Sequence, residues 1–178
     1  MRFYEALDLE PKLALDLDDL KRRFYERSRQ WHPDRFARGS PEEREKALEM
    51  TAVLNDAFRT LRDPNTRAAY FFKHKGIDLP KEAPPDVLKE FFELNMELEE
   101  LRSGDESVRP DVAMAYERIL DMREKTDTAL AGLFELYDRN EDMRPTLIGP
   151  AGDLLNVHRY LSNYLRAAGK ELHVPLPN

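Results

Sequence analysis

The residues most suited to chemistry are three neighbours, His32, Pro33 and Asp34, in a chain of 178 residues. An imidazole close to a carboxylate is a common arrangement for acid–base catalysis, so an enzyme is the first class to test. No serine or cysteine nucleophile stands beside them in a recognisable frame, and the other histidines lack the spacing of a ligand set (His74, His158 and His173). The sequence therefore predicts neither a catalytic site nor a metal site, and one interpretation of the tripeptide is a loop in which Asp34 caps a helix and His32 is a chance neighbour.

Positive charge is concentrated around this tripeptide. Residues 20–38 hold seven Lys or Arg against two acidic residues, although the whole chain has a formal net charge of −7. At about 100° per residue on a helix, Lys21, Arg22 and Arg29 project away from the apolar face. Most charged runs are only a solvated helix face, but a net charge of +5 in 19 residues is more than that usually gives. We predict a basic surface leading to the tripeptide. Nucleic acid is not the expected partner, because the chain as a whole is acidic.

The elements that must position the tripeptide are helices. Pro33 ends the first of them, because the residue before a proline disfavours helical dihedral angles. Ser40, with Glu43 three residues later, predicts a capping box at the start of the next helix. The expected order is a helix over 17–31, a loop over 34–39, a helix from 41 to 62 and a short helix over about 65–74.

The pattern changes after residue 75. Residues 76–86 contain three prolines and are interpreted as a stiff linker. The net charge is +2 over residues 1–75 and −9 over residues 76–178, which indicates two surfaces for different partners. Three further helices are predicted over about 87–102, 110–138 and 152–168, with an irregular segment over 139–151 and Gly169 as a C-terminal cap. The predicted fold is all-α, with a helical hairpin domain over 1–75 and a C-terminal three-helix bundle over 87–178.

Phe92 and Met96 project from the side of the 87–102 helix that faces away from its apolar face. Glu93, Glu97 and Glu100 lie beside them. Such a pair either forms a protein-binding patch or packs against another helix of the same chain, and the pattern alone favours neither. The residues expected to face the bundle core are Val87, Phe91, Leu94, Leu98 and Leu101.

Residues 1–75 resemble the J-domain, the module that activates the ATPase of Hsp70-type chaperones. The resemblance rests on Phe3-Tyr4-Glu5-Ala6-Leu7, on Trp31-His32-Pro33-Asp34-Arg35, and on the stretch from Asn55 to Pro64 followed by Arg67 and Tyr70. Trp31 stands where tyrosine is more usual. In that family the His-Pro-Asp loop and the basic helix contact Hsp70 and stimulate ATP hydrolysis. The resemblance therefore implies Hsp70 contacts at His32, Pro33, Asp34, Lys21, Arg22, Arg29 and Arg35.

The whole chain is similar to the HscB (Hsc20) family of co-chaperones for iron–sulfur cluster assembly. That family combines a short N-terminal J-domain, a linker with prolines and a C-terminal three-helix bundle, and the Gly39-Ser40 pair after the loop is also like it. The cysteine-rich zinc extension of some eukaryotic members is absent. The family's bundle binds the cluster scaffold protein through an apolar and acidic surface. The resemblance therefore implies scaffold contacts at Phe92, Met96, Glu97, Glu100 and Tyr160, no cofactor and no catalytic activity of its own.

The sequence also bears on the expected compartment and leaves two alternative functions open. The chain has no cysteine, no apolar run near 18 residues and no signal-peptide core at its start, so a membrane span is not expected and the cytoplasm is the expected compartment. One alternative is a general J-domain co-chaperone whose bundle binds a different client or is only structural. Another is a helical enzyme, which requires a pocket around His32. The sequence leaves open which Hsp70 and which client are bound, and the oligomeric state.

Overall fold

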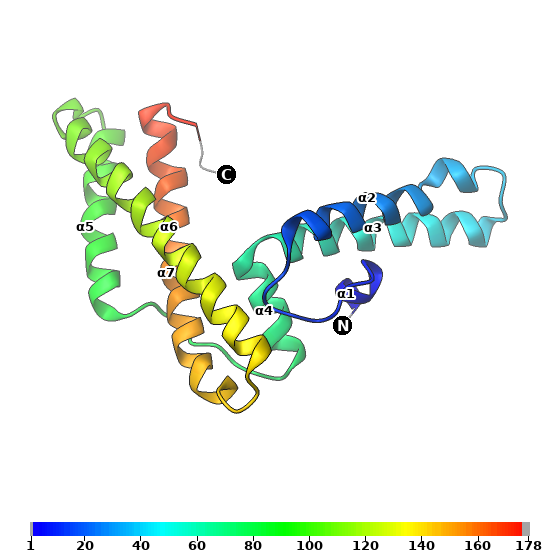
Figure 1. The fold of residues 1–178 in the computed structure, drawn as a ribbon. Helices are drawn as coiled ribbons and strands as arrows, with labels where there is room; N and C mark the ends of the chain where they lie inside the picture. Colours follow the sequence, from blue (N-terminus) through cyan, green and yellow to red (C-terminus); the bar gives the residue numbers. More distant parts are fainter. Residues whose placement is uncertain (1, 176–178) are drawn as a thin grey trace. The chain divides into compact units, whose positions relative to one another are not determined.

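A computed structural model describes residues 2–175, apart from the side chain of Asp86, and every regular element among them is helical (Figure 1). The predicted all-α fold class is confirmed. The chain divides into two compact units, one ending at Asp78 and the other beginning at Leu79. The first unit contains α1 (Arg2–Ala6), α2 (Leu17–Gln30), a short 3₁₀ helix η1 (Pro33–Phe36), α3 (Pro41–Arg62) and α4 (Pro64–His74).

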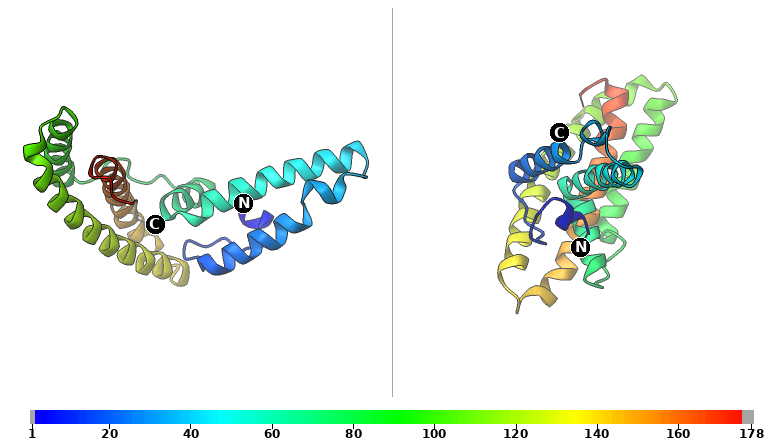
Figure 2. Two further views of the ribbon diagram at one scale, coloured as in Figure 1. Left: turned by 90° about the horizontal axis from the view of Figure 1, so that it is seen from above. Right: turned by 90° about the vertical axis from the view of Figure 1, so that its right-hand side faces the viewer.

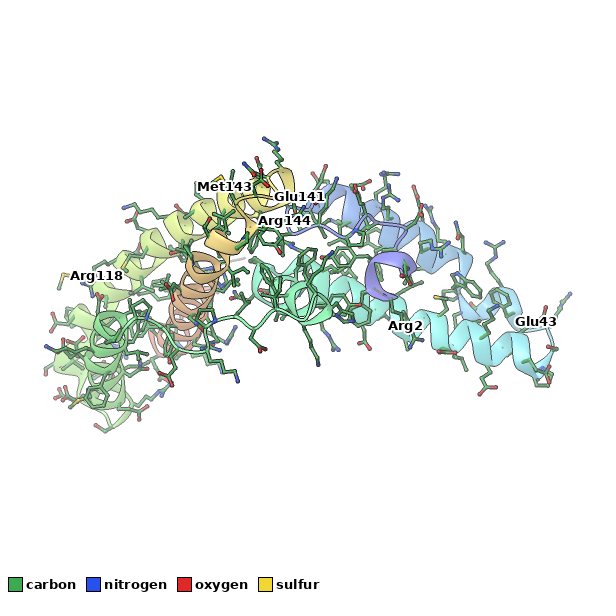
Figure 3. The ribbon with its side chains drawn as sticks, turned by 90° about the horizontal axis from the view of Figure 1, so that it is seen from below. Arg2, Glu43, Arg118, Glu141, Met143 and Arg144 are labelled. Carbon is green, nitrogen blue, oxygen red and sulfur yellow. The ribbon has the colours of Figure 1, made fainter. Side chains whose placement is uncertain are left out.

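Helices α2 and α3 lie side by side as a hairpin, as the two further views in Figure 2 also show. Leu20 of α2 and Leu54 of α3 are buried, and the rings of Phe24 and Phe58 stack with centroids 4.4 Å apart. Helix α1 packs on α3, where Arg2 pairs with Glu49 at 2.6 Å (Arg2 is labelled in Figure 3). Burial of these apolar side chains is what holds two otherwise exposed helices together.

The turn between α2 and α3 is fixed at its far end by a helix cap. The side chain of Ser40 accepts the N–H of Glu43 at 3.2 Å, and the Glu43 carboxylate accepts the N–H of Ser40 at 2.8 Å (Glu43 is labelled in Figure 3). The predicted capping box is therefore present, and such a cap stabilises a helix by about 1 kcal/mol. The prediction of a loop over 34–39 is wrong in part, because the first of these residues continue the 3₁₀ turn η1 that starts at Pro33.

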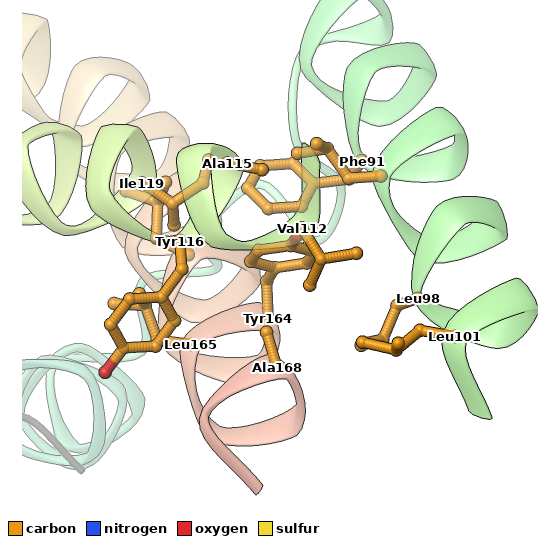
Figure 4. Close-up of a cluster of buried hydrophobic side chains, with 12 residues drawn as sticks. Phe91, Leu98, Leu101, Val112, Ala115, Tyr116, Ile119, Tyr164, Leu165 and Ala168 are labelled. Atoms are coloured by element: carbon orange, nitrogen blue, oxygen red, sulfur yellow. The ribbon is translucent and has the colours of Figure 1, made fainter. Parts of the chain in front are cut away.

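The second unit contains α5 (Pro85–Arg102), η2 (Glu106–Val108), α6 (Arg109–Arg139) and α7 (Arg144–Leu172). The three long helices share one apolar cluster (Figure 4). Its members are Phe91, Leu94, Leu98 and Leu101 from α5, Val112, Ala115, Tyr116 and Ile119 from α6, and Leu161, Tyr164, Leu165 and Ala168 from α7. The apolar face predicted for the 87–102 helix thus forms one wall of this core, except that Val87 is only partly buried.

The expected irregular segment over 139–151 is wrong in part, because only residues 140–143 lie outside the helices. Helix α7 begins at Arg144 and continues through Pro150. A proline inside a helix removes one ladder hydrogen bond, and here the packing of α7 along α6 compensates for it. Arg144 fixes the tight turn, because it donates to Tyr137 O at 3.0 Å and pairs with Glu141 at 2.7 Å (Figure 3). The expected cap at Gly169 is also wrong, since α7 ends at Leu172 with His173 in the left-handed conformation.

Only part of the segment predicted as a linker over 76–86 behaves as one, because the rest packs on a helix. Beyond Asp78 it lies against α7, where the buried Asn156 amide donates to Pro80 O at 2.9 Å and to Glu82 O at 3.0 Å. Ala83 is buried in the same unit, and Gly152 leaves room for the ring of Pro80. Residues 79–83 therefore form a strap that belongs to the second unit.

Candidate functional site

The His-Pro-Asp loop lies at the end of the α2–α3 hairpin. Nδ1 of His32 accepts the backbone N–H of Asp34 at 3.3 Å and so caps η1, while Pro33 occupies the first helical position, where no N–H is needed. The side chains of His32 and Asp34 remain 59% and 90% exposed. Their Nδ1 and Oδ2 atoms are 3.5 Å apart, an exposed pair that contributes little stability. Both side chains are therefore accessible to another molecule.

The basic side chains of α2 have two different roles. Arg27 donates to Ala6 O at 3.0 Å, and Arg23 pairs with Asp19 and donates to the backbone at Asp8, so both hold the first unit together. The hydrogen bond from Arg23, with that from Arg22, lowers the pKa of Asp19. Arg23 and Arg27 are therefore structural, and the accessible positive charge of α2 comes from its other cations.

Lys21, Arg22 and Arg29 are exposed, as predicted. The charge of Arg22 is partly offset, because its guanidinium pairs with Asp19 and lies 3.5 Å from Glu26. Neither Lys21 nor Arg29 forms an ion pair with any residue that the structure describes. The exposed positive charge of α2 thus comes mainly from these two side chains.

Two further exposed residues, Arg35 and Tyr25, differ in whether the sequence predicts them as contacts. Arg35, predicted as a contact residue, is exposed, and one of its nitrogens lies 3.4 Å from Arg29 O at the end of α2. Tyr25 was missed, although it is exposed and its position on the helix falls between Lys21 and Arg29. An exposed aromatic in the middle of a basic face is the signal that could have identified it.

The second candidate site is on α5. Phe92 and Met96 are 67% and 52% exposed, so they do not pack against another helix of the described chain. Together with Asn95, Glu99, Glu100 and Ser103 they line a shallow hollow of about 500 Å³. A hollow with two large apolar side chains at its surface is typical of a protein-binding patch.

The remaining predicted residues of this site lie elsewhere. Glu97 lines an adjacent hollow of about 280 Å³ between α5 and α6, together with Leu94, Asp111, Met114, Ala115 and Arg118 (Arg118 is labelled in Figure 3). The ring of Tyr160 is partly buried against Phe91, with centroids 5.6 Å apart, and does not line either hollow. Met114, which the sequence reasoning missed, is 65% exposed. It could have been found as a methionine on the polar face of α6.

Some of the carboxylates around the two hollows are paired with arginines and others are not. Glu99 pairs with Arg102, and Glu90 pairs with Arg118 at 3.0 Å. By contrast, Glu93, Glu97 and Glu100 form no ion pair with any residue between 2 and 175. This surface therefore combines apolar area with negative charge, which favours a partner that is apolar and basic.

Neither site is accompanied by a metal cluster or a membrane helix in the described part of the chain. No three acidic or histidine side chains among residues 2–175 are grouped to hold a metal ion. None of the described helices combines the length and apolarity needed to span a bilayer.

Comparison with known proteins matches part of the chain to a family model and nearly the whole chain to solved structures. Residues 2–70 match the family model of the DnaJ domain. The chaperone HscB from Vibrio cholerae is similar with a TM-score of 0.75 and 24% identity, over 97% of this chain and 98% of that one. The human co-chaperone HscB is similar with a TM-score of 0.73 and 23% identity, over 96% of this chain and 81% of that one.

Proposed function

Residues 2–70 are a DnaJ domain and the chain as a whole has the fold of the HscB co-chaperones, and from this premise we propose that the protein is a J-type co-chaperone that stimulates ATP hydrolysis by an Hsp70. The observation that carries the proposal is the exposed His-Pro-Asp loop at the end of a hairpin whose α2 face is basic. In this proposal Lys21, Arg22, Arg29 and Arg35 guide the Hsp70 to the hairpin. The loop residues His32, Pro33 and Asp34 then make the contact that triggers hydrolysis.

The second unit is proposed to bind an iron–sulfur cluster scaffold protein. The support is the hollow around Phe92 and Met96 and the unpaired carboxylates Glu97 and Glu100. An apolar hollow gives affinity by releasing water, and the carboxylates select a partner with basic side chains and speed its association. Tyr160 does not line the hollow. Its ring contacts Phe91 in the core, so in this proposal it positions α5 and does not touch the scaffold.

The two sites together give the proposed mechanism. One unit holds the client and the other presents it to the chaperone, and the chain itself catalyses no step. Because each unit has its own surface, of opposite net charge, the two partners do not compete for one site. Tethering the client beside the chaperone raises its effective concentration there.

The proposal is tested by single-turnover ATP hydrolysis with three purified proteins: an Hsp70, the full chain and an iron–sulfur scaffold protein. We expect the chain alone to accelerate hydrolysis and the scaffold to raise the rate further when both are present. Acceleration by the chain without any effect or binding of the scaffold would instead support a J-domain co-chaperone with another client. No acceleration by the chain would contradict the co-chaperone function.

A further inference from the structure

Trp31 and Phe36 lie at the two ends of the His-Pro-Asp loop, and their rings contact each other. They stack with centroids 5.8 Å apart and planes inclined by only 12°. Trp31 is the last residue before His32, and Phe36 ends the short helix η1 that contains Pro33 and Asp34. The stack therefore joins the two ends of the loop and limits how far the backbone between them can move.

Helix α3 holds this stack in place from outside the loop. The ammonium group of Lys46 lies 5.8 Å from the centroid of the Trp31 ring, a cation–π contact. The hydroxyl of Thr51 lies 3.1 Å from Trp31 O and 2.8 Å from Ala47 O, so its proton is shared between the carbonyl before His32 and its own helix. Both contacts tie the start of the loop to α3.

The exposed residues of the loop obtain little support of their own. Within it, Asp34 N–H donates to His32 Nδ1 at 3.3 Å and Arg35 N–H donates to His32 O at 3.0 Å. The side chains of His32 and Asp34 are mostly exposed, so packing contributes little to their orientation. Their direction depends on the backbone, and the backbone depends on Trp31 and Phe36.

We infer that Trp31, Phe36, Lys46 and Thr51 form a clamp that holds the loop in the conformation an Hsp70 recognises, which makes them positioning residues for stimulation of its ATPase. This inference rests on the proposed co-chaperone function. If the loop adopts the conformation that Hsp70 recognises for only part of the time, stimulation of the ATPase falls in proportion to that fraction. Binding of the Hsp70 through the basic face of α2 can still occur. Loss of the clamp should consequently lower the maximal stimulation more than the affinity.

The test compares Thr51→Val with Thr51→Ser, which keeps the hydroxyl, in single-turnover hydrolysis by an Hsp70 at increasing concentrations of the full chain. We expect Thr51→Val to lower the maximal stimulation by up to about five-fold, because losing one ordinary hydrogen bond changes the equilibrium between the competent and other loop conformations by about that factor. The concentration for half-maximal stimulation should change less than two-fold, and Thr51→Ser should restore the maximum. Phe36→Ala, which removes the stack, should act in the same direction.

Trp31 provides a second readout, because it is the only tryptophan in the chain. Its emission should shift to longer wavelength, and acrylamide should quench it faster, in Thr51→Val and Phe36→Ala at unchanged helical circular dichroism. The matched control is Thr128→Val on α6, where the threonine hydroxyl donates to Glu124 O at 3.0 Å within its own helix. That variant should change neither emission nor stimulation.

The outcomes separate this inference from the proposed function. Wild-type protein that stimulates, with Thr51→Val and Phe36→Ala stimulating equally well, overturns the clamp and leaves the co-chaperone function standing. The clamp is also overturned if stimulation falls only in proportion to an unfolded fraction measured by circular dichroism. Wild-type protein that does not stimulate any Hsp70 overturns the proposed function, and the clamp with it.

Discussion

Phe91 and Phe92 are neighbours in the sequence and lie on opposite faces of α5. Phe91 is 3% exposed and its ring meets those of Tyr160 and Tyr164, with centroids 5.6 and 6.3 Å away. Phe92 is 67% exposed and lines the hollow on the outer side of the helix. The same chemical group therefore stabilises the bundle at one position and is available to a partner at the next.

Truncation of each phenylalanine should separate folding from binding. Phe91→Ala should lower the free energy of unfolding by about 3–5 kcal/mol, as for other buried aromatics. Phe92→Ala should change it by no more than about 0.5 kcal/mol, because the ring is at the surface. The same Phe92→Ala variant should lose about 1–3 kcal/mol of scaffold binding, measured by titration calorimetry. Unfolding of the bundle by Phe92→Ala would show that the ring belongs to the core.

The cations of α2 should contribute unequally to association with an Hsp70. Arg29→Glu should slow association more than Arg22→Glu, because Asp19 and Glu26 already offset part of the Arg22 charge. Surface charges are screened over about 10 Å at 0.1 M salt, so both effects should shrink as salt rises. Stopped-flow association at several salt concentrations measures this. Rates that are independent of salt would mean that the basic face is only solvated.

The strap over residues 79–83 should be part of the folded second unit. A Cβ added at Gly152 would lie 2.8 Å from Pro80 Cγ, so Gly152→Ala should lower the free energy of unfolding by about 1–3 kcal/mol. Gly132→Ala on α6 is the matched control, since a Cβ there meets nothing within 4 Å and should stabilise the helix by about 0.5–1 kcal/mol. Thermal melting measures both effects, and the melting temperature of Gly152→Ala should lie below that of Gly132→Ala. Equal melting temperatures of the two variants would contradict the packing of residues 79–83 on α7.

The buried Tyr164 should make stability depend on pH in the alkaline range. Burial, together with the charge of Glu97, raises the pKa of Tyr164 from 10.0 to about 12. The folded state then keeps a proton that the unfolded state loses, so stability is unaffected below about pH 10 and decreases between about pH 10 and 12. The full effect is about 2–3 kcal/mol.

Tyr164→Phe isolates this effect from the titration of lysines in the same range. The Tyr164 hydroxyl is buried without a hydrogen-bond partner among the described residues, so its removal should be neutral or stabilising at pH 7. The variant should lose less stability than wild type between pH 10 and 12 in urea denaturation. Equal losses would show that this phenol does not titrate differently in the two states.

Much of the fold follows from local signals in the sequence. Ser40 and Glu43 form the expected capping box because a cap depends only on residues three positions apart. The opposite orientations of Phe91 and Phe92 follow from the helical period alone. These features are set by neighbours along the chain, which a sequence shows directly.

The errors arise where tertiary packing outweighs local preference. Pro150 and Gly149 predict an irregular segment, yet α7 runs through both because its apolar side packs on α6. The prolines over 76–86 predict a linker, but the strap is held by Asn156, which lies more than 70 residues away in the sequence. The sequence groups Glu97 and Tyr160 with Phe92 and Met96, but Glu97 lines the hollow between α5 and α6, and Tyr160 lies on α7 with its ring against Phe91. Sequence spacing does not show which neighbouring helix covers each side.

The most direct test of the account is His32→Gln in single-turnover ATP hydrolysis by an Hsp70. His32 is exposed and its ring makes only a cap within the loop, so the variant should keep wild-type circular dichroism and melting temperature. It should bind the scaffold as wild type does, because the second site lies in the other unit. The account predicts that stimulation of hydrolysis is lost at every concentration of the folded variant. Stimulation equal to that of wild type would contradict it.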